Sequence, residues 1–204
     1  MKNIDLLYER NYLIIEKFIT PEDCNLLSDG YKEFCARKNV ESDVMCENTA
    51  SYYNYLPFVQ LMTESTKTIC DYLGEKVMPT FSYARMYKNG SVLEKHKDRP
   101  ECEIAVSCHL SGDKPWPFYI INPDGGTDWI HMKQGDAVIY LGSKVPHWRD
   151  AYDGESYVQA MLFYIKTYGK YSEHYFDKIH QVNRVMYSLF KKNYNHQPYG
   201  QDND

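Results

Sequence analysis

The sequence predicts a mainly β domain with flanking helices, in which antiparallel strands form a double-sheet sandwich or jelly roll. Two observations predict this fold class. Within residues 79–166, apolar residues alternate with a period of two through about eight short segments, and turn residues separate these segments. The connections are too short to hold crossover helices, so the strands must run antiparallel.

The composition is that of one folded domain. The chain has 204 residues, of which 43% are hydrophobic and 25% charged, which excludes a disordered chain. A formal net charge of −5 provides no basic surface for nucleic acid or anionic lipid. No apolar run approaches the ~18 residues of a membrane span, and the N-terminus has no signal-peptide core. We therefore expect a cytoplasmic protein without nucleic-acid or membrane partners, and the sequence leaves its oligomeric state open.

Cysteine and tyrosine stand out among the residue types. The 6 cysteines are irregularly spaced and include no CxxC pair, so we expect reduced thiols rather than disulfides or a cysteine zinc site. The 20 tyrosines must be shared among the core, the surface and any cavity of the domain.

Residues 1–78 are predicted to supply supporting helices. Asn11–Phe18 is a short, strand-like apolar run. Thr20 then serves as the N-cap of a helix that begins with Pro21 and continues to about Arg37.

A polar stretch from Lys38 to Ser51 lacks periodicity and is predicted to be a loop. A loop of this length in a compact domain is often functional, so it is a candidate lid over a cavity. A second helix is expected from Tyr55 to Tyr72, where apolar residues recur every three to four positions, with Gly74 as its C-cap.

The β region begins with a strand that places four residues on one face: Phe81, Tyr83, Arg85 and Tyr87. The turn Asn89–Gly90 ends this strand. The strands expected after it are Val92–Asp98, Cys102–Leu110, Phe118–Asn122, Trp129–Met132, Ala137–Leu141, Val145–Ala151 and Tyr157–Lys166. A last helix is expected within residues 167–192, starting near Tyr171, and residues 193–204 form a polar tail.

Three residues of the β region could share a metal ion. His96 and Asp98 are two positions apart on a predicted strand, so their side chains project to the same face. His147 lies on another predicted strand and can complete a set of two imidazoles and one carboxylate. Such a set leaves coordination positions open and suits non-haem Fe(II). A His-x-Asp pair is frequent by chance, so its weight depends on the motifs around it.

The order of these motifs resembles the catalytic core of the 2-oxoglutarate/Fe(II)-dependent dioxygenases, especially the prolyl-4-hydroxylase-like branch. The motifs are Arg85–Gly90, His96–Asp98, Gly125–Gly126, Gly135–Ala137 and Val145–His147. The resemblance covers about Phe81–Lys166, and Leu13–Asp29 is similar to the N-terminal strand and helix of that group. It implies a double-stranded β-helix (jelly roll) core, with His96, Asp98 and His147 as the catalytic iron ligands. It also implies that Tyr87 forms a hydrogen bond with the co-substrate.

The sequence departs from this branch at one position. In the branch, a Lys or Arg about ten residues after the distal His pairs with the far carboxylate of 2-oxoglutarate, but Asp153–Tyr164 contains no basic residue. Arg149 is the strongest replacement, because it lies two positions from His147 and its guanidinium can hold a carboxylate bidentately. Arg85 is the second choice. His109 and Gln159 are further candidate contacts of the co-substrate.

The resemblance implies an Fe(II)/2-oxoglutarate-dependent dioxygenase that uses O₂, with ascorbate as an optional reductant. Its expected reaction couples the decarboxylation of 2-oxoglutarate to C–H hydroxylation. The expected substrate is a prolyl residue of a peptide or a small amino-acid-like molecule. The missing basic residue favours an alternative, in which the chain is a jelly-roll metal-binding module or a degenerate member that acts as a binding protein. A cupin-type isomerase or hydrolase is a third reading, although such sites commonly carry more histidines.

Overall fold

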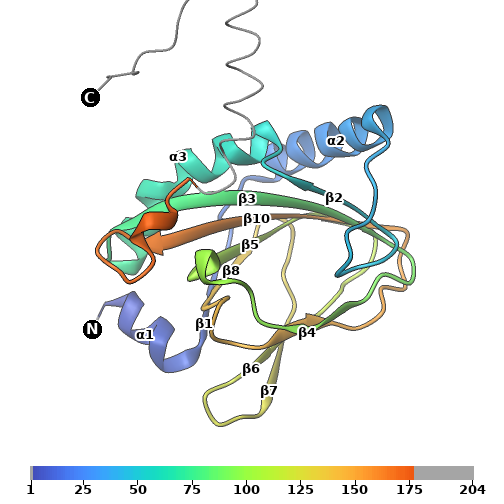
Figure 1. The fold of residues 1–204 in the computed structure, drawn as a ribbon. Helices are drawn as coiled ribbons and strands as arrows, with labels where there is room; N and C mark the ends of the chain where they lie inside the picture. Colours follow the sequence, from blue (N-terminus) through green and yellow to red (C-terminus); the bar gives the residue numbers. More distant parts are fainter. Residues whose placement is uncertain (1, 177–204) are drawn as a thin grey trace, which may run out of the picture.

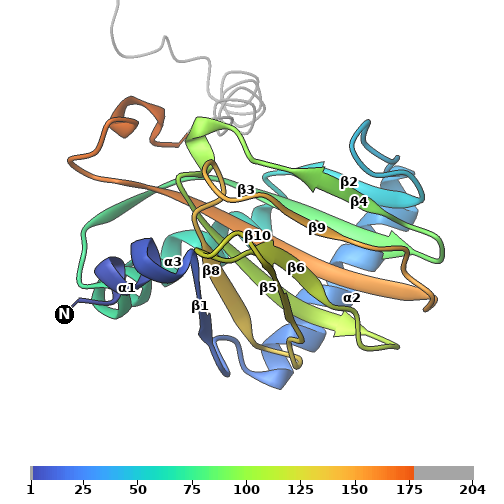
Figure 2. The same ribbon diagram turned by 90° about the horizontal axis from the view of Figure 1, so that it is seen from below.

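A computed structural model describes residues 2–176 of the protein (Figure 1). The fold has three layers. Two helices, α2 (Pro21–Lys38) and α3 (Leu56–Leu73), lie on one face of a large sheet, and a smaller sheet lies on its other face (Figures 1 and 2). The space between the two sheets holds the candidate site.

All strand pairs in the described residues are antiparallel. The large sheet has the order β1 (Tyr12–Ile15), β8 (Ala137–Tyr140), β5 (Ile104–Gly112), β10 (Ser156–Lys166), β3 (Val77–Lys88) and β2 (Thr49–Tyr53). The smaller sheet has the order β4 (Leu93–His96), β9 (His147–Arg149), β6 (Phe118–Ile121) and β7 (Thr127–Ile130). Two facing antiparallel sheets with flanking helices confirm the predicted fold class.

The two longer helices begin and end where the sequence predicts. Thr20 has extended backbone and its hydroxyl accepts a hydrogen bond from the Asp23 N–H at 3.2 Å, which satisfies one free donor of the first turn of α2. Asn39 ends α2 in the left-handed conformation. Gly74, with φ of 64°, ends α3, because a residue without Cβ adopts this conformation at little cost.

Two elements of residues 1–78 are absent from the sequence-based prediction. The helix α1 (Asn3–Arg10) buries only Ile4 and Leu7, so its apolar pattern is too sparse to recognise. The strand β2 begins inside the stretch predicted to be a loop, and it pairs with β3 at the edge of the large sheet. The predicted loop is therefore shorter than Lys38–Ser51, and the N-terminal part supplies two strands as well as helices.

The predicted C-terminal helix lies mostly outside the described residues. The described residues contain two short 3₁₀ turns, at Pro100–Cys102 and at Ser172–His174. The second turn lies where the sequence predicts the start of the C-terminal α-helix. The first described residues of the predicted helix, up to Phe176, thus include a 3₁₀ turn rather than an α-helix. The rest of the helix predicted over 167–192, and the tail predicted over 193–204, lie beyond the part that the structure describes.

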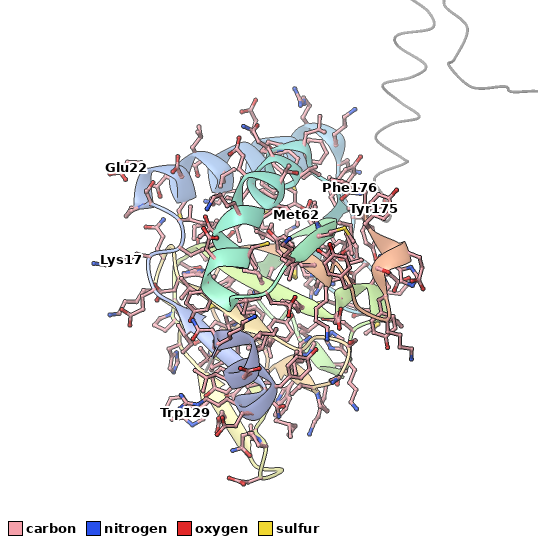
Figure 3. All side chains as sticks on the ribbon, turned by 90° about the vertical axis from the view of Figure 1, so that its left-hand side faces the viewer. Lys17, Glu22, Met62, Trp129, Tyr175 and Phe176 are labelled. Carbon is pink, nitrogen blue, oxygen red and sulfur yellow. The ribbon has the colours of Figure 1, made fainter. Side chains whose placement is uncertain are left out.

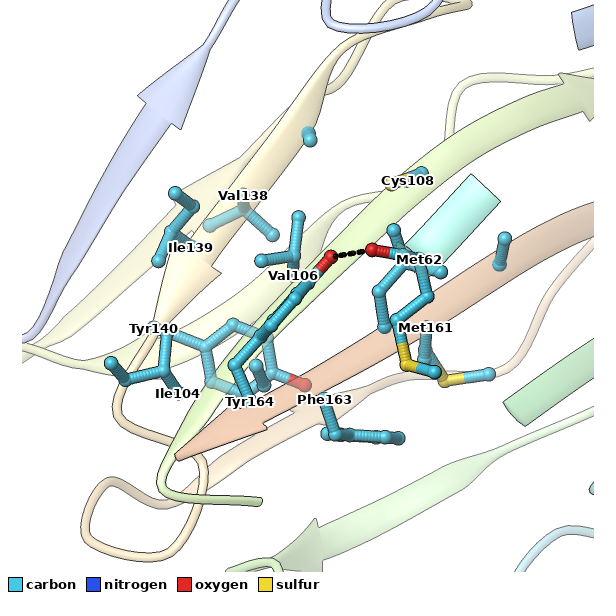
Figure 4. Packing of buried hydrophobic residues seen from close by; sticks show 14 of the residues in the cluster. Met62, Ile104, Val106, Cys108, Val138, Ile139, Tyr140, Met161, Phe163 and Tyr164 are labelled. Carbon is cyan, nitrogen blue, oxygen red and sulfur yellow. Dashed lines mark hydrogen bonds between the residues drawn. The ribbon is translucent and has the colours of Figure 1, made fainter. Parts of the chain in front are cut away.

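The two faces of the large sheet have different neighbours. On β10, Tyr164 faces the helices and its hydroxyl donates to the carbonyl of Met62 in α3 at 2.8 Å (Figure 4). Alternate residues of the same strand, Met161 and Phe163, face the smaller sheet. The alternation of residues along β10 separates a helix–sheet core from a cavity between the sheets.

At the outside of the molecule, Lys17 and Glu22 project away from the body (Figure 3).

All six cysteines are free thiols, and five of them are buried. Among the described helices, none has the length and apolar character needed to cross a membrane.

Candidate metal centre and its cavity

His96 and His147 lie opposite one another on the smaller sheet. The register of β4 and β9 pairs His96 directly with His147. Asp98 follows two residues after His96, and its backbone N–H donates to the carbonyl of Gly142 at 2.9 Å. The sheet register thus brings the three predicted metal ligands together.

The three side chains form a compact cluster. One ligand atom from each of His96, Asp98 and His147 lies within 4.8 Å of the others. The Nε2 atom of His96 is 3.4 Å from Asp98 Oδ1, and the Nε2 atom of His147 is 3.7 Å from Asp98 Oδ2. Asp98 Oδ2 is buried and has no hydrogen-bond partner among the described residues. A buried carboxylate oxygen without a partner is costly, and a cation held between it and the imidazoles would satisfy it.

Backbone carbonyls orient both imidazoles. The carbonyl of Glu94 is 2.7 Å from His96 Nδ1, and the carbonyl of Val145 is 2.9 Å from His147 Nδ1. Because a carbonyl oxygen can only accept, each Nδ1 carries a proton and each Nε2 faces the cluster, where the neutral ring presents a lone pair. Such a partner on the second nitrogen fixes the tautomer that binds a metal.

The pKa values of the two histidines shift in opposite directions. His147 is 2% exposed, and burial lowers its pKa, which favours the neutral form that a metal ligand needs. Burial also acts to lower the pKa of His96, but its hydrogen bonds to Asp98 and to the Glu94 carbonyl outweigh this and raise the pKa.

The cluster lies in a cavity of about 420 Å³ between the two sheets. The inward face of β3 supplies four lining residues, in the alternation that the sequence predicts: Phe81, Tyr83, Arg85 and Tyr87. Aromatic contacts connect this wall to the neighbouring strands, for example between Phe81 and Phe163, whose ring centroids are 4.6 Å apart. The cavity is therefore largely apolar, with a few polar groups at defined positions.

Arg149 is a buried cation in this cavity. Its side chain is 0% exposed, and one Nη donates to the Trp116 carbonyl at 2.7 Å while the other lies 3.5 Å from the Tyr157 hydroxyl. Its Nε has no partner among the described residues. No Asp or Glu within residues 2–176 forms an ion pair with it. A buried guanidinium without a carboxylate is expensive, so the position favours an anionic ligand.

Arg85 also lines the cavity, but its charge is neutralised within the protein. Its Nη2 pairs with the carboxylate of Asp43, which comes from the loop that precedes β2. Its other nitrogens donate to the hydroxyls of Ser51 and Tyr87, at 3.2 and 3.3 Å. Asp43 also accepts hydrogen bonds from the backbone of Met45 and from Tyr83. Arg85 therefore holds the loop against the cavity wall.

The remaining predicted contacts divide into two groups. Tyr87 and Gln159 line the cavity, and the Oε1 of Gln159 is buried without a partner among the described residues. His109 does not line it. Its ring stacks on Tyr157 with centroids 4.3 Å apart, and burial lowers its pKa to about 4, so it packs as a neutral ring behind the wall.

Tyr140 is a cavity residue that sequence reasoning did not single out. It ends β8, is 3% exposed, and its ring centroid lies 4.7 Å from that of His147. Burial raises its pKa well above the usual value, and the nearby Asp98 carboxylate raises it further. The only sequence signal was strand parity within Ala137–Leu141, which leaves open which face is inward.

Comparison with known proteins identifies the fold. No protein-family model matches the chain, and no curated protein matches its sequence. Among solved structures, a prolyl-4-hydroxylase from Pseudomonas putida aligns over 80% of this chain and 96% of its own, with a TM-score of 0.64 and 14% identity. HygX from Streptomyces hygroscopicus, solved with nickel and 2-oxoglutarate bound, aligns over 81% of this chain and 86% of its own, with a TM-score of 0.62 and 13% identity.

A third similar structure is the α-ketoglutarate-dependent epimerase SnoN from nogalamycin biosynthesis. It covers 80% of this chain and 81% of its own, with a TM-score of 0.67 and 9% identity. These neighbours are 2-oxoglutarate-dependent oxygenases that catalyse different reactions. At 9–14% identity they establish that this chain has the jelly-roll fold of those oxygenases.

Proposed function

We propose that the protein is an Fe(II)/2-oxoglutarate-dependent dioxygenase, and specifically a hydroxylase. The observation that carries this proposal is the content of one cavity. It holds a set of two histidines and one aspartate and, two residues along β9 from His147, the buried and unpaired Arg149. Alternate residues of a strand are about 7 Å apart, so a short diacid with a chelating end would reach from the metal cluster to the guanidinium.

The cluster residues fit Fe(II). They offer two neutral imidazole nitrogens and one carboxylate, which is the facial donor set of non-haem Fe(II) oxygenases. The unpaired Asp98 Oδ2 is the atom that a bound cation would satisfy. The carbonyl partners of both Nδ1 atoms keep the Nε2 atoms directed at the ion.

The cavity residues fit 2-oxoglutarate as the co-substrate. Arg149 would take the carboxylate far from the metal, because no protein carboxylate competes for it within the described residues. The Tyr87 hydroxyl accepts from Arg85, so its own proton is free to be donated to the ligand. Gln159 provides a further polar contact on the β10 wall. Arg85 is paired with Asp43 and holds the loop before β2, so we do not assign it to the co-substrate.

Iron and 2-oxoglutarate, when bound, supply the oxidative chemistry: with O₂, decarboxylation to succinate and CO₂ accompanies hydroxylation of a substrate C–H bond, and ascorbate serves as an optional reductant. The protein positions and shields the reactants. Phe118 and Tyr140 pack against His147 and exclude water from one side of the cluster. The loop residues Asp43 and Met45 form part of the cavity wall.

The proposed substrate is a prolyl or peptidyl group or a small amino-acid-like molecule. The cavity wall is mostly aromatic and apolar, which suits a compact group with an unactivated C–H bond. The formal net charge of −5 does not favour a nucleic-acid substrate. The solved neighbours act on different molecules: one HygX structure contains hygromycin B, and another similar structure is a viral collagen prolyl hydroxylase.

Turnover in air tests the proposal. Purified protein with Fe(II), ascorbate and 2-oxoglutarate should form succinate slowly without substrate and faster with a true substrate. His147→Ala should abolish succinate formation, whereas Glu22→Gln, on the outside of α2, should leave it unchanged. Metal binding without any succinate, with or without a panel of prolyl peptides and amino acids, would instead support the binding-module alternative.

A further inference from the structure

The cavity contains a tyrosine, Tyr140, whose hydroxyl has no hydrogen-bond partner within residues 2–176. The Tyr140 side chain is 3% exposed and lines the cavity, yet its hydroxyl bonds to none of the residues that the structure describes. Buried tyrosine hydroxyls usually have a partner. In this protein Tyr31, Tyr87, Tyr157 and Tyr164 are buried and all have one. Tyr140 differs from them, because its hydroxyl has no hydrogen-bond partner among the described residues and its side chain lines the cavity.

The position of Tyr140 indicates what its partner is. Its ring lies 4.7 Å from the ring of His147 and 5.2 Å from that of Phe118. Phe118 in turn lies 5.5 Å from the His147 ring and 5.4 Å from the guanidinium carbon of Arg149. The Phe118 ring thus lies between the metal cluster and Arg149 and contacts the Tyr140 ring. Figure 4 shows the Tyr140 side chain extending from β8 in the direction of β10.

The electrostatic surroundings agree with this placement. Burial is the main cause of the raised pKa of Tyr140, the Asp98 carboxylate raises this pKa further, and the Arg149 guanidinium acts to lower it. The hydroxyl does not bond to Asp98, although Asp98 Oδ2 has no other partner. A ligand that fills the path would place oxygen atoms next to the hydroxyl.

We infer that Tyr140 is a binding residue for the co-substrate, whose hydroxyl donates a hydrogen bond to a carboxylate oxygen of 2-oxoglutarate. This inference rests on the proposed function. It adds a third donor to Arg149 and Tyr87, on β8, which β5 and β10 separate from the strand β3 of Tyr87. The chain lacks a basic residue in Asp153–Tyr164, and a phenol from β8 supplies part of the binding that such a residue would give.

The experiment compares Tyr140→Phe with Tyr164→Phe, which removes a buried hydroxyl on the other face of the same sheet. Nickel-loaded protein, which does not turn over, is titrated with 2-oxoglutarate by calorimetry. Nickel affinity without 2-oxoglutarate and the melting temperature of the metal-free protein are measured in parallel. A hydrogen bond to a charged group is worth about tenfold or more in Kd.

Tyr140→Phe should raise the Kd for 2-oxoglutarate about tenfold, leave nickel affinity unchanged and leave the metal-free melting temperature equal or higher, because no bond is lost. Tyr164→Phe should lower the melting temperature, since it removes a buried hydrogen bond between β10 and the Met62 carbonyl of α3, and keep the Kd for 2-oxoglutarate.

Three outcomes would overturn the inference. If Tyr140→Phe leaves the Kd for 2-oxoglutarate unchanged, the hydroxyl does not contact the co-substrate. If the variant melts at a lower temperature, the hydroxyl stabilises the fold instead. If the variant binds nickel more weakly, the hydroxyl positions the Asp98 carboxylate. If the wild-type protein binds nickel but not 2-oxoglutarate, the proposed function itself fails. This result differs from equal binding of 2-oxoglutarate by wild type and Tyr140→Phe, which overturns only the inference about Tyr140.

Discussion

His96 and His147 are paired directly across the antiparallel ladder of β4 and β9, and their ring centroids are 4.4 Å apart. The geometry of the candidate metal centre is therefore set by strand register. A slip of one residue between these strands would turn one imidazole to the opposite face and remove the site. Asp98 lies beyond the paired residues, so its position depends on a different contact, the loop at Gly142.

Gly142→Ala is expected to damage the metal centre without touching a ligand. A Cβ at this position would lie 2.5 Å from Asp98 Oδ2 and 2.8 Å from the Cys102 carbonyl, so the carboxylate must move. We expect metal affinity to fall by about 10–100-fold, as for other changes that misplace a ligand. Isothermal titration with nickel measures this. Gly126→Ala, whose Cβ would have the Asn122 side chain as its nearest neighbour, is the control and should bind nickel normally.

Arg149→Met is expected to separate ligand binding from stability. The methionine keeps much of the packing against Trp116 but removes a charge that has no carboxylate partner among the described residues. Binding of 2-oxoglutarate should weaken by at least about 30-fold, because truncating a buried partner of a charge costs about 2 kcal/mol or more. The melting temperature of the ligand-free protein should not fall. Arg149→Lys should restore little of the affinity, since an ammonium cannot form the bidentate pair. Full affinity in Arg149→Met would show that the anchor lies elsewhere.

Asp43→Asn is expected to destabilise the folded protein. The variant keeps an acceptor for the Met45 N–H but leaves Arg85, which is 6% exposed, without a counter-charge. An unpaired buried charge should cost about 2 kcal/mol in the free energy of unfolding, measured with urea. Asp71→Asn breaks an exposed pair with Lys67 on α3 and is the matched control, which should unfold at the same urea concentration as the wild type. Equal midpoints for both variants would show that the Asp43–Arg85 pair does not hold the loop.

Asp113 is expected to account for part of the loss of folding stability at acidic pH. It accepts hydrogen bonds from the backbone N–H groups of Ser156 and Glu155 and from the Tyr152 hydroxyl, and these lower its pKa to about 2. The unfolded-state pKa is about 3.9, so the stabilisation is complete above that pH and is lost as the pH falls toward 2. Wild type should be more stable than Asp113→Asn at pH 5, and the difference should shrink by pH 2.5. A difference that stays constant over this range in urea unfolding would contradict the assignment.

Local patterns were sufficient to predict the β core and the two long helices. Period-two alternation around Phe81–Tyr87 placed the inward residues of β3, and Thr20 with Pro21 marked the start of α2. The strand β2 could not be predicted, because its five residues lie at the edge of the sheet and their burial depends on β3, which is distant in the sequence.

The candidate metal centre could be proposed from sequence because strand parity fixes the relation of His96 to Asp98. Strand parity also ranked Arg149 above Arg85 as the anchor, but it could not predict that Arg85 is neutralised within the protein, because this depends on where carboxylates lie in space. Asp43 is 42 residues from Arg85 and belongs to a loop without periodicity. The free hydroxyl of Tyr140 is likewise a property of the packed cavity, since nothing in Ala137–Leu141 distinguishes it from a core tyrosine.

The most direct test of the central claim is an anaerobic titration of the protein with Fe(II) and 2-oxoglutarate, followed by visible absorption. Chelation of the iron by 2-oxoglutarate gives a charge-transfer band. We expect the wild-type protein to develop this band with saturation at one equivalent of Fe(II), and His147→Ala to show none. The absence of a band in the wild-type protein, together with no succinate after admission of air, would contradict the assignment of this cavity to an Fe(II)/2-oxoglutarate oxygenase.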